Sequence, residues 1–256
     1  MVLSTISSST LFHFTDTAEH LLSILENEFR PHLSLEDFSL LTSKQAKDRD
    51  FRMAIPMVSF CDIPLSQATN HMDTYGHYAV GLTKAWGMQR GLTPVLYTHD
   101  GSLSLKALVE LGRLAKSQRK SSDSVADAIM ANLSRVLLLS KPYEGPYSRR
   151  GQPPKHVRFY DEREWRFIPP SLDDVPVLSP STYDDVATRD AANAKVAQYV
   201  LSFTPSDIRY VIVPSEAELL PTIRELERIK GPKYSLDDVK VLTSRVMSAE
   251  QIQADF

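Results

Sequence analysis

The stretch Arg158-Phe159-Tyr160-Asp161-Glu162-Arg163-Glu164-Trp165-Arg166-Phe167-Ile168 places charged side chains in a segment that otherwise has the composition of a buried strand. Side chains alternate along a strand, so Glu164, Arg166 and Ile168 are expected on one face of the sheet. Glu164 and Arg166 would then lie about 7 Å apart along the strand. A guanidinium beside a partly buried acid keeps the carboxylate ionised at a fixed position. The pair therefore suits a catalytic carboxylate, and it equally suits a structural ion pair.

The composition is that of a globular protein with a real core, because 42% of the 256 residues are hydrophobic and 24% are charged. A formal net charge of -3 excludes a global basic field that would recruit nucleic acid. The single cysteine, Cys61, excludes an intramolecular disulfide and fits a reducing compartment. No apolar run reaches the roughly 20 residues that span a bilayer, and Met1–Thr10 lacks the features of a secretory signal. We expect a cytoplasmic chain with no membrane partner.

Strand-like and helix-like segments alternate along the whole chain, which predicts one α+β domain over residues 1–256 with a mixed or antiparallel sheet. Helical spacing is expected in four segments: 18–29, 103–116, 124–139 and 216–230. The expected strands are 11–15, 55–61, 78–83, 94–98, 164–168, 196–203, 208–213 and 239–242. Residues 84–91 are expected to form a hairpin loop, and 36–52 a helix-and-loop segment.

Several common chemistries lack their sequence patterns. The chain has no Gly-x-Gly-x-x-Gly motif, no phosphate-binding loop of the P-loop type and no zinc-ligand spacing, so no metal site is expected. The basic residues of 113–120 are interpreted as a solvated face. Arg149 and Arg150 are candidates for contact with phosphate or nucleic acid.

Three residues outside the charged strand are candidates for ligand binding. His13 lies in the middle of an expected strand, on the face opposite to that of its neighbours Phe12 and Phe14. It is either a structural residue whose imidazole is hydrogen-bonded within the protein or a residue that hydrogen-bonds a ligand hydroxyl. Tyr75 and Tyr78 flank a turn, where they serve as core residues or form an aromatic wall for a flat ring.

Several motifs resemble the AbiGi family, described as the antitoxin component of a bacterial abortive phage-infection system. The resemblance runs from about Leu11 to Phe167 and loosely through the strand at 208–214. Its motifs are Leu-Phe-His-Phe-Thr at 11–15, Leu-Leu-x-Ile-Leu at 21–25, Met-Val-Ser-Phe-Cys-Asp-Ile-Pro-Leu-Ser at 57–66, His-x-x-x-Tyr-Gly-x-Tyr at 71–78, Gly-Leu-Thr-Lys-x-Trp-Gly at 81–87 and Pro-Val-Leu-Tyr at 94–97. It implies a role in phage defence and a toxin protein as partner.

More distantly, the arrangement resembles the ADP-ribosyltransferase superfamily, which implies an ADP-ribosyltransferase-like fold and NAD as a substrate. By that resemblance Glu164 would hold the ribose 2′-hydroxyl and stabilise the oxocarbenium-like centre. The NAD-binding residues it implies are His13 on the adenosine-side ribose, Tyr75 or Tyr78 on nicotinamide, and Arg166 or Arg49 on the pyrophosphate, with Arg52 as a further candidate near Arg49. If Arg166 instead neutralises Glu164, the pocket is a degenerate one.

Three functions follow as hypotheses. The first is NAD-dependent ADP-ribosyl transfer to a protein or nucleic acid acceptor during phage infection. The second is a non-enzymatic antitoxin or regulatory partner that binds a toxin protein, with Glu164 and Arg166 as a structural pair. The third is a nucleic-acid sensor that uses Arg149, Arg150 and the basic stretch 113–120.

Overall fold

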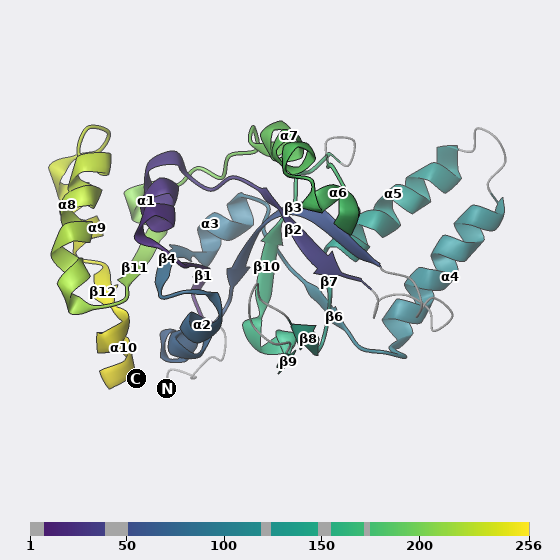
Figure 1. Ribbon diagram of the computed structural model, residues 1–256, viewed down its shortest axis with the longest axis horizontal. Coiled ribbons are helices and arrows are strands. Elements are labelled where there is room, and N and C mark those ends of the chain that lie inside the picture. Colours follow the sequence, from purple (N-terminus) through teal and green to yellow (C-terminus); the bar gives the residue numbers. More distant parts are fainter. Residues whose placement is uncertain (1–7, 39–50, 119–123, 148–154, 172–174, 256) are drawn as a thin grey trace. The chain divides into compact units, whose positions relative to one another are not determined.

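The computed structural model describes residues 8–38, 51–118, 124–147, 155–171 and 175–255 (Figure 1). The chain divides into two compact units, which are described separately below. Unit 1 consists of Met1–Arg30, Ser59–Thr93 and Val200–Phe256, and unit 2 of Pro31–Val58 and Pro94–Tyr199. The fold class is α+β, as predicted, while a single domain over 1–256 stays a prediction.

Unit 1 is built on a mixed sheet with the strand order β12, β11, β4, β1 and the end of β3. β1 pairs antiparallel with β4 along its whole length, from Thr10↔Thr83 to Thr15↔Tyr78. β11 pairs antiparallel with β4 and parallel with β12, which makes the sheet mixed. The strands are β1 (Thr10–Thr15), β3 (Arg52–Cys61, shared with unit 2), β4 (Tyr78–Thr83), β11 (Ile208–Val213) and β12 (Val246–Ser248).

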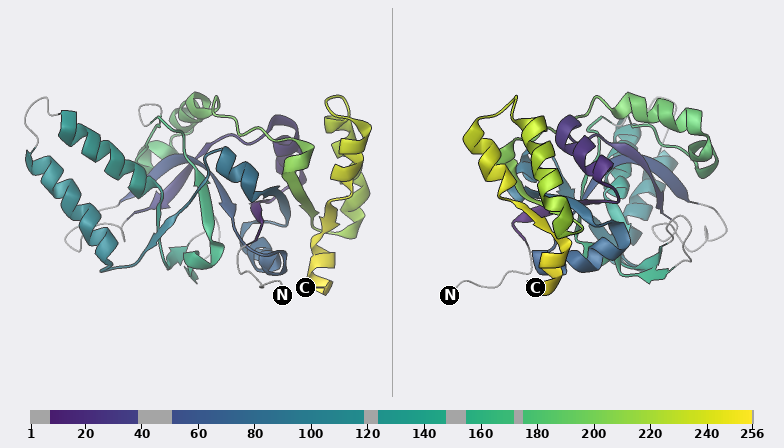
Figure 2. Two further views of the ribbon diagram at one scale, coloured as in Figure 1. Left: turned by 180° about the vertical axis from the view of Figure 1, so that it is seen from behind. Right: turned by 60° about the vertical axis from the view of Figure 1, so that its left-hand side comes forward.

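In unit 1 helices alternate with strands along the chain, and α1 packs against α8 (Figure 2). α1 begins where the side chain of Thr17 accepts a hydrogen bond from the backbone N–H of His20. The helices are α1 (Ala18–Asn27), η3 (Leu65–Gln67), α2 (Ala68–Tyr75), α3 (Lys84–Gln89), η6 (Pro205–Asp207), η7 (Glu216–Glu218), α8 (Leu219–Lys230), α9 (Leu236–Thr243) and α10 (Ala249–Asp255).

The alternation of β1 separates two packed layers in unit 1. Phe12 lies in a core with Met72, Ile212 and Ile252, and Phe14 packs against that core. The opposite face of β1 carries His13, in contact with a group of aromatic rings that includes those of Phe29, Phe60, Trp86 and Phe203. His13 therefore faces away from Phe12 and Phe14, as the strand period predicted.

Unit 2 contains β2 paired antiparallel with β3, from His32↔Met57 to Asp37↔Arg52. On the sheet path β3 is followed by β10 and then by β5 (Thr93–Pro94). Two small pairs complete the strands: β6 with β7 in parallel, and β8 with β9 antiparallel. The strands are β2 (His32–Asp37), β6 (Leu96–Thr98), β7 (Ser140–Pro142), β8 (Gly145–Tyr147), β9 (Lys155–Val157) and β10 (Glu164–Phe167).

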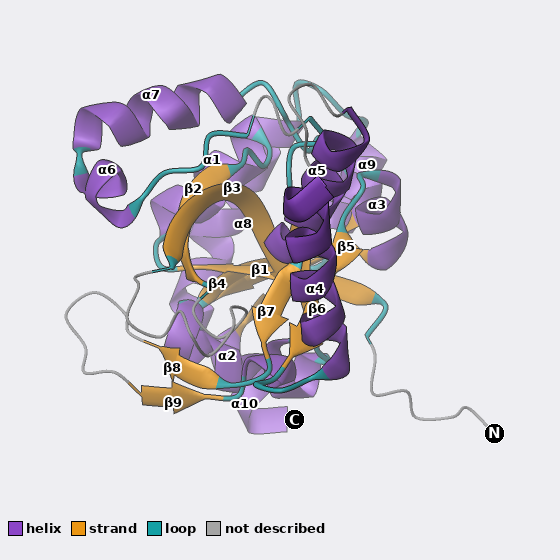
Figure 3. Ribbon diagram, turned by 90° about the vertical axis from the view of Figure 1, so that its right-hand side faces the viewer, coloured by secondary structure: helices purple, strands orange, loops and turns teal. Residues whose placement is uncertain are grey.

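The helices of unit 2 belong to two groups (Figure 3). α7 packs against β2, where the backbone N–H of Leu33 donates to Asn193 Oδ1. α4 and α5 pack on each other and are anchored at their base, because Leu105 and Leu138 join a core cluster with Ile55. The helices are α4 (Leu103–Gln118), α5 (Ser124–Leu138), η4 (Phe159–Glu162), α6 (Pro180–Asp184) and α7 (Val186–Val196).

Three secondary-structure expectations were wrong. Residues 84–91 contain the helix α3, which Thr83 caps by accepting from Trp86 N–H. Residues 196–203 are not a strand, because α7 runs to Val196 and Leu201 forms only an isolated bridge with Phe29. Residues 239–242 lie inside the helix α9. The expected helix-and-loop segment 36–52 falls mostly on 39–50, outside the described residues; its ends at 36–37 and 52 belong to the strands β2 and β3. Short apolar runs fit strands and helices equally well, so tertiary packing decides between them.

Gly76 has a fixed backbone role between α2 and β4. Its φ of +113° lies in a region that residues with a Cβ rarely adopt, and an added Cβ would collide with the carbonyl oxygen of Thr15. The close approach of Gly76 to Thr15 aligns β4 with β1 from its first residue.

Gly76→Ala is therefore expected to lower the free energy of unfolding by about 3 kcal/mol, through backbone strain and the clash with Thr15. Urea denaturation followed by circular dichroism measures the change. Gly112→Ala is the matched control, because its added Cβ would make only an ordinary contact with Leu133 and would favour the helix. Equal destabilisation by the two substitutions would contradict the role of Gly76.

Candidate functional site

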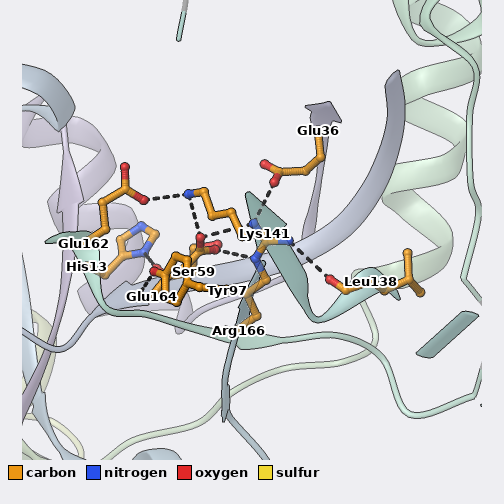
Figure 4. Close-up of polar contacts among 9 residues, drawn as sticks. All are labelled: His13, Glu36, Ser59, Tyr97, Leu138, Lys141, Glu162, Glu164 and Arg166. Atoms are coloured by element: carbon orange, nitrogen blue, oxygen red, sulfur yellow. Dashed lines mark hydrogen bonds and ion pairs between the residues drawn. The ribbon is translucent and has the colours of Figure 1, made fainter. Parts of the chain in front are cut away.

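The Glu164–Arg166 pair predicted from the sequence exists, and it lies buried in unit 2 (Figure 4). Arg166 is 0% exposed and Glu164 5% exposed. Arg166 Nε donates to Glu164 Oε1 at 2.5 Å, and Arg166 Nη2 donates to Glu164 Oε2 at 3.1 Å. This two-point contact fixes the plane of the guanidinium against that of the carboxylate.

Arg166 makes two further contacts with distant parts of the chain. Its Nη2 also donates to Glu36 Oε2 at 2.6 Å, and its Nη1 donates to the backbone carbonyl of Leu138 at 3.2 Å. Glu36 comes from β2 and Leu138 from the end of α5. One arginine therefore holds together β2, α5 and β10.

Lys141 of β7 is the second cation of the cluster. Its Nζ donates to Glu162 Oε2 at 2.6 Å and to Glu164 Oε2 at 2.8 Å, and it lies 4.8 Å from the centre of the Phe159 ring. Three carboxylates (Glu36, Glu162 and Glu164) thus surround two cations, so the described members of this cluster carry a net charge of -1. We call these five residues the charge cluster.

Local backbone geometry brings Glu162 and Glu164 to the same lysine. Arg163 adopts the left-handed conformation, with φ 47° and ψ 51°, at the junction of η4 and β10. The backbone N–H of Glu164 donates to the phenol oxygen of Tyr97 at 2.8 Å, which anchors the first residue of β10. The turn at Arg163 therefore lets two acids, one on each side of it, share Lys141.

The electrostatics of the charge cluster keep Glu164 ionised. Burial alone would raise the pKa of Glu164, but the charges of Arg166 and Lys141 outweigh it and hold the pKa well below its ordinary value. Burial likewise would lower the pKa of Lys141, but the carboxylates of Glu164 and Glu162 raise it above its ordinary value. The shifts of Glu164 and Lys141, together with the raised pKa of Arg166, keep these three groups charged near neutral pH.

A cavity of about 370 Å³ in unit 2 borders the charge cluster. Glu36 and Lys141 belong to both the cavity wall and the cluster, while Glu164 and Arg166 do not line the cavity. The other lining residues relevant here are Asp37, Arg52, Tyr147 and Phe159. A small molecule in this cavity could contact Lys141 directly. It could not contact Glu164, which does not line the cavity and is bound to Lys141.

Of the other residues predicted to bind NAD, His13, Tyr75 and Tyr78 lie in unit 1, Arg52 lies in unit 2, and Arg49 lies outside the described residues. His13 Nδ1 donates to the backbone carbonyl of Ser59 at 2.9 Å, so Nε2 is left as an acceptor, and burial lowers the pKa of the imidazole. Arg49 falls outside the described residues, and Arg52 lines the cavity of unit 2. An NAD site assembled from both units stays a prediction.

Tyr75 and Tyr78 lie on opposite faces of the unit 1 sheet and so do not form one aromatic surface. Tyr78 is on the same face of the sheet as His13, because His13 pairs with Val80 and Tyr78 lies two residues away along β4. Its phenol donates to Glu218 Oε2 at 2.6 Å, and burial together with this carboxylate raises the pKa of Tyr78 to about 12. Tyr75 instead stacks on His71, which stacks on Phe14 of the opposite face.

Sequence reasoning missed Glu36, Lys141, Glu162 and Tyr97. Glu162 had a detectable signal, because it lies within the charged stretch itself. Lys141 and Glu36 had none, since they lie 23 and 130 residues before their partners in the cluster. The residues that the structure describes place no three His, Cys, Asp or Glu side chains so as to hold a metal ion, and none of their helices is long and apolar enough to cross a membrane. Arg149 and Arg150 lie outside the described residues.

Comparison with known proteins gives a family and one relative. Residues 27–214 match the family model described as "Putative abortive phage resistance protein AbiGi, antitoxin". The chain is 27% identical, over 224 residues, to the abortive phage resistance protein AbiGi of Lactococcus lactis subsp. cremoris, an alignment that covers 79% of this chain and 89% of that protein. No solved structure matches the chain.

Glu164→Gln is expected to lower the free energy of unfolding by about 3 kcal/mol. An amide presents an N–H group where Arg166 and Lys141 require acceptors, so buried donors lose their partners. Urea denaturation near neutral pH measures the loss. Glu110→Gln is the control, because that carboxylate pairs with Arg113 on an exposed helix surface and its loss should leave no measurable change. Wild-type stability of Glu164→Gln would contradict the structural role of the cluster.

The same carboxylate predicts an acid-dependent stability. The folded-state pKa of Glu164 is below its ordinary value of 4.5, so the unfolded chain takes up its proton first as the pH falls. The contribution of Glu164 is complete above about pH 4.5 and is lost progressively below it. Denaturation curves between about pH 7 and about pH 3.5 should therefore show a smaller acid loss in Glu164→Gln than in the wild type. Parallel curves would show that Glu164 does not titrate with folding.

Proposed function

Because the chain belongs to the AbiGi family of abortive phage resistance proteins, we propose that it acts as an antitoxin that binds and restrains a toxin protein. On this proposal its activity is stoichiometric binding and not NAD chemistry. One observation favours toxin binding over NAD chemistry: Glu164 is buried, and both of its carboxylate oxygens are already bound by Arg166 and Lys141.

An ADP-ribosyltransferase would need a carboxylate that reaches the ribose of NAD. Both oxygens of Glu164 are taken by Arg166 and Lys141, and its side chain is nearly fully buried. Breaking these contacts to admit a hydroxyl group would leave buried cations without their acceptor, which costs several kcal/mol. This cost supports a structural role for the residue that NAD chemistry would need most.

Arg166 supports the same conclusion from the side of the ligand. A pyrophosphate-binding arginine must present free N–H groups to solvent or to the ligand. The Arg166 side chain is 0% exposed, and its Nε, Nη1 and Nη2 atoms each donate to a protein oxygen. An ADP-ribosyltransferase-like architecture, if the chain has one, would then serve as a scaffold for binding, because a fold does not fix a function.

The proposal predicts two results for the purified full chain. Co-expression with a candidate toxin, taken as the product of a gene adjacent to its own, should give a stoichiometric complex in size-exclusion chromatography and should relieve growth arrest. Incubation with NAD, with nucleic acid or cell lysate as acceptor, should release no nicotinamide above the background without protein.

Glu164→Gln separates the two functions. On the proposal it reduces the amount of folded protein but leaves the affinity of each folded molecule for the toxin unchanged. Nicotinamide release by folded wild type that is lost in folded Glu164→Gln would overturn the proposal and establish NAD chemistry. The proposal would also be overturned if the wild type relieves growth arrest by a toxin in cells but does not bind that toxin when both are purified.

A further inference from the structure

The helices α4 and α5 form a hairpin that extends from the rest of unit 2 (Figures 1 and 2). They pack on each other along their length, and a Cβ at Gly112 of α4 would lie 3.7 Å from Leu133 Cδ1 of α5. Ala115, Ala126 and Leu133 are buried, as a contact between two paired helices requires. The two helices are joined through 119–123, so they run antiparallel.

Each helix also carries a stripe of exposed apolar side chains. On α4 these are Leu103, which is 82% exposed, Leu111 and Leu114, and they recur at helical spacing. On α5 they are Val125, which is 66% exposed, Ile129 and Val136, also at helical spacing. A surface helix of a globular protein normally turns such a stripe toward a core, and here both stripes face solvent.

The two stripes lie on the same side of the hairpin. At about 100° per residue, the stripe of α4 precedes the face that contacts α5 by about 110° in the chain direction. The stripe of α5 precedes the face that contacts α4 by about 70°. Offsets of the same sign turn the stripes of two antiparallel neighbours to the same side, so the six side chains form one apolar surface, which we call the hairpin face.

The hairpin face is not needed for the packing of the hairpin itself. The contact between the helices uses Gly112, Ala115, Ala126 and Leu133, and the attachment to unit 2 uses Leu105 and Leu138. The six side chains of the hairpin face remain between 37% and 82% exposed. They therefore provide apolar surface that a partner would bury.

Charge along the edges of the hairpin face distinguishes between occupants. The outer edges carry Lys106, Arg113 and Arg135 against one acid, Glu110, which is bound to Arg113. The described edges are therefore net positive. A second copy of the chain would bring the same positive edges together, whereas an acidic partner would be attracted to them.

We propose that the hairpin face is the surface that docks the toxin, through an amphipathic helix whose apolar side fills the space between the two stripes and whose flanks are acidic. This inference rests on the proposed antitoxin function and names the surface and the partner chemistry for it. Apolar contact supplies the affinity, and Lys106 and Arg135 orient the acidic helix.

Three matched variants test the docking surface. Leu111→Ser/Ile129→Ser removes the centre of both stripes and is expected to weaken toxin binding at least about tenfold. Lys106→Glu/Arg135→Glu is expected to weaken it by a similar factor at low salt, with the difference shrinking as salt is added. Leu220→Ser/Val241→Ser alters exposed apolar residues of unit 1 and should leave binding unchanged.

A designed peptide supplies a probe that is independent of the toxin. A helical peptide with leucine at the apolar positions and glutamate on its flanks should bind the full-length chain in fluorescence anisotropy. The same peptide with lysine in place of glutamate should bind at least about tenfold more weakly. Circular dichroism of each variant confirms that the fold is retained, because all substituted side chains are exposed.

The outcomes separate the inference from the proposed function. If Leu111→Ser/Ile129→Ser binds and restrains the toxin as well as the wild type, the hairpin face is wrong while the antitoxin function stands. If light scattering shows a dimer that only the hairpin variants dissociate, a second copy occupies the face and the inference is overturned. If the wild type binds no toxin, the proposed function fails. Loss of binding in both hairpin variants with retention in the control supports the inference.

Discussion

The two-point contact between Arg166 and Glu164 is the interaction on which unit 2 depends. Neither charge is tolerated in a buried position alone, because the loss of hydration is larger than any single contact returns. Together they form a flat, fixed pair, and the remaining N–H groups of Arg166 reach Glu36 on β2 and the carbonyl of Leu138 at the end of α5. Segments far apart in sequence are thus fixed to β10 by one side chain.

Lys141 completes this constraint by holding the second oxygen of Glu164, Oε2, as well as Glu162. Its Nζ binds two carboxylates across the left-handed turn at Arg163, that of Glu162 at the end of η4 and that of Glu164 at the start of β10. Strain in the backbone often marks functional sites, but here it serves to direct Glu162 and Glu164 toward one cation. The cavity beside Lys141 stays separate from Glu164.

The charge cluster and the hairpin face of unit 2 differ in how far their side chains are exposed to solvent. Within the cluster, Glu162, Glu164 and Arg166 are buried and pair with one another through Lys141 or directly, while Glu36 and Lys141 also line the cavity. The hairpin face leaves apolar side chains in solvent, which lowers solubility and persists only where something covers it. The chain belongs to a phage-resistance family described as an antitoxin. On the antitoxin function proposed above, recognition would lie on the helices and rigidity in the sheet.

The sequence by itself determined the local features of this protein. The two-residue period placed Glu164 beside Arg166 and His13 opposite Phe12, and helical spacing located α4 and α5, because these signals arise from neighbouring residues. Tertiary structure alone decided that Lys141 and Glu36 complete the cluster and that residues 239–242 are helical. Tertiary packing determines which residues far apart in sequence come into contact and how short apolar runs are buried. A pattern of neighbouring residues carries no information about either.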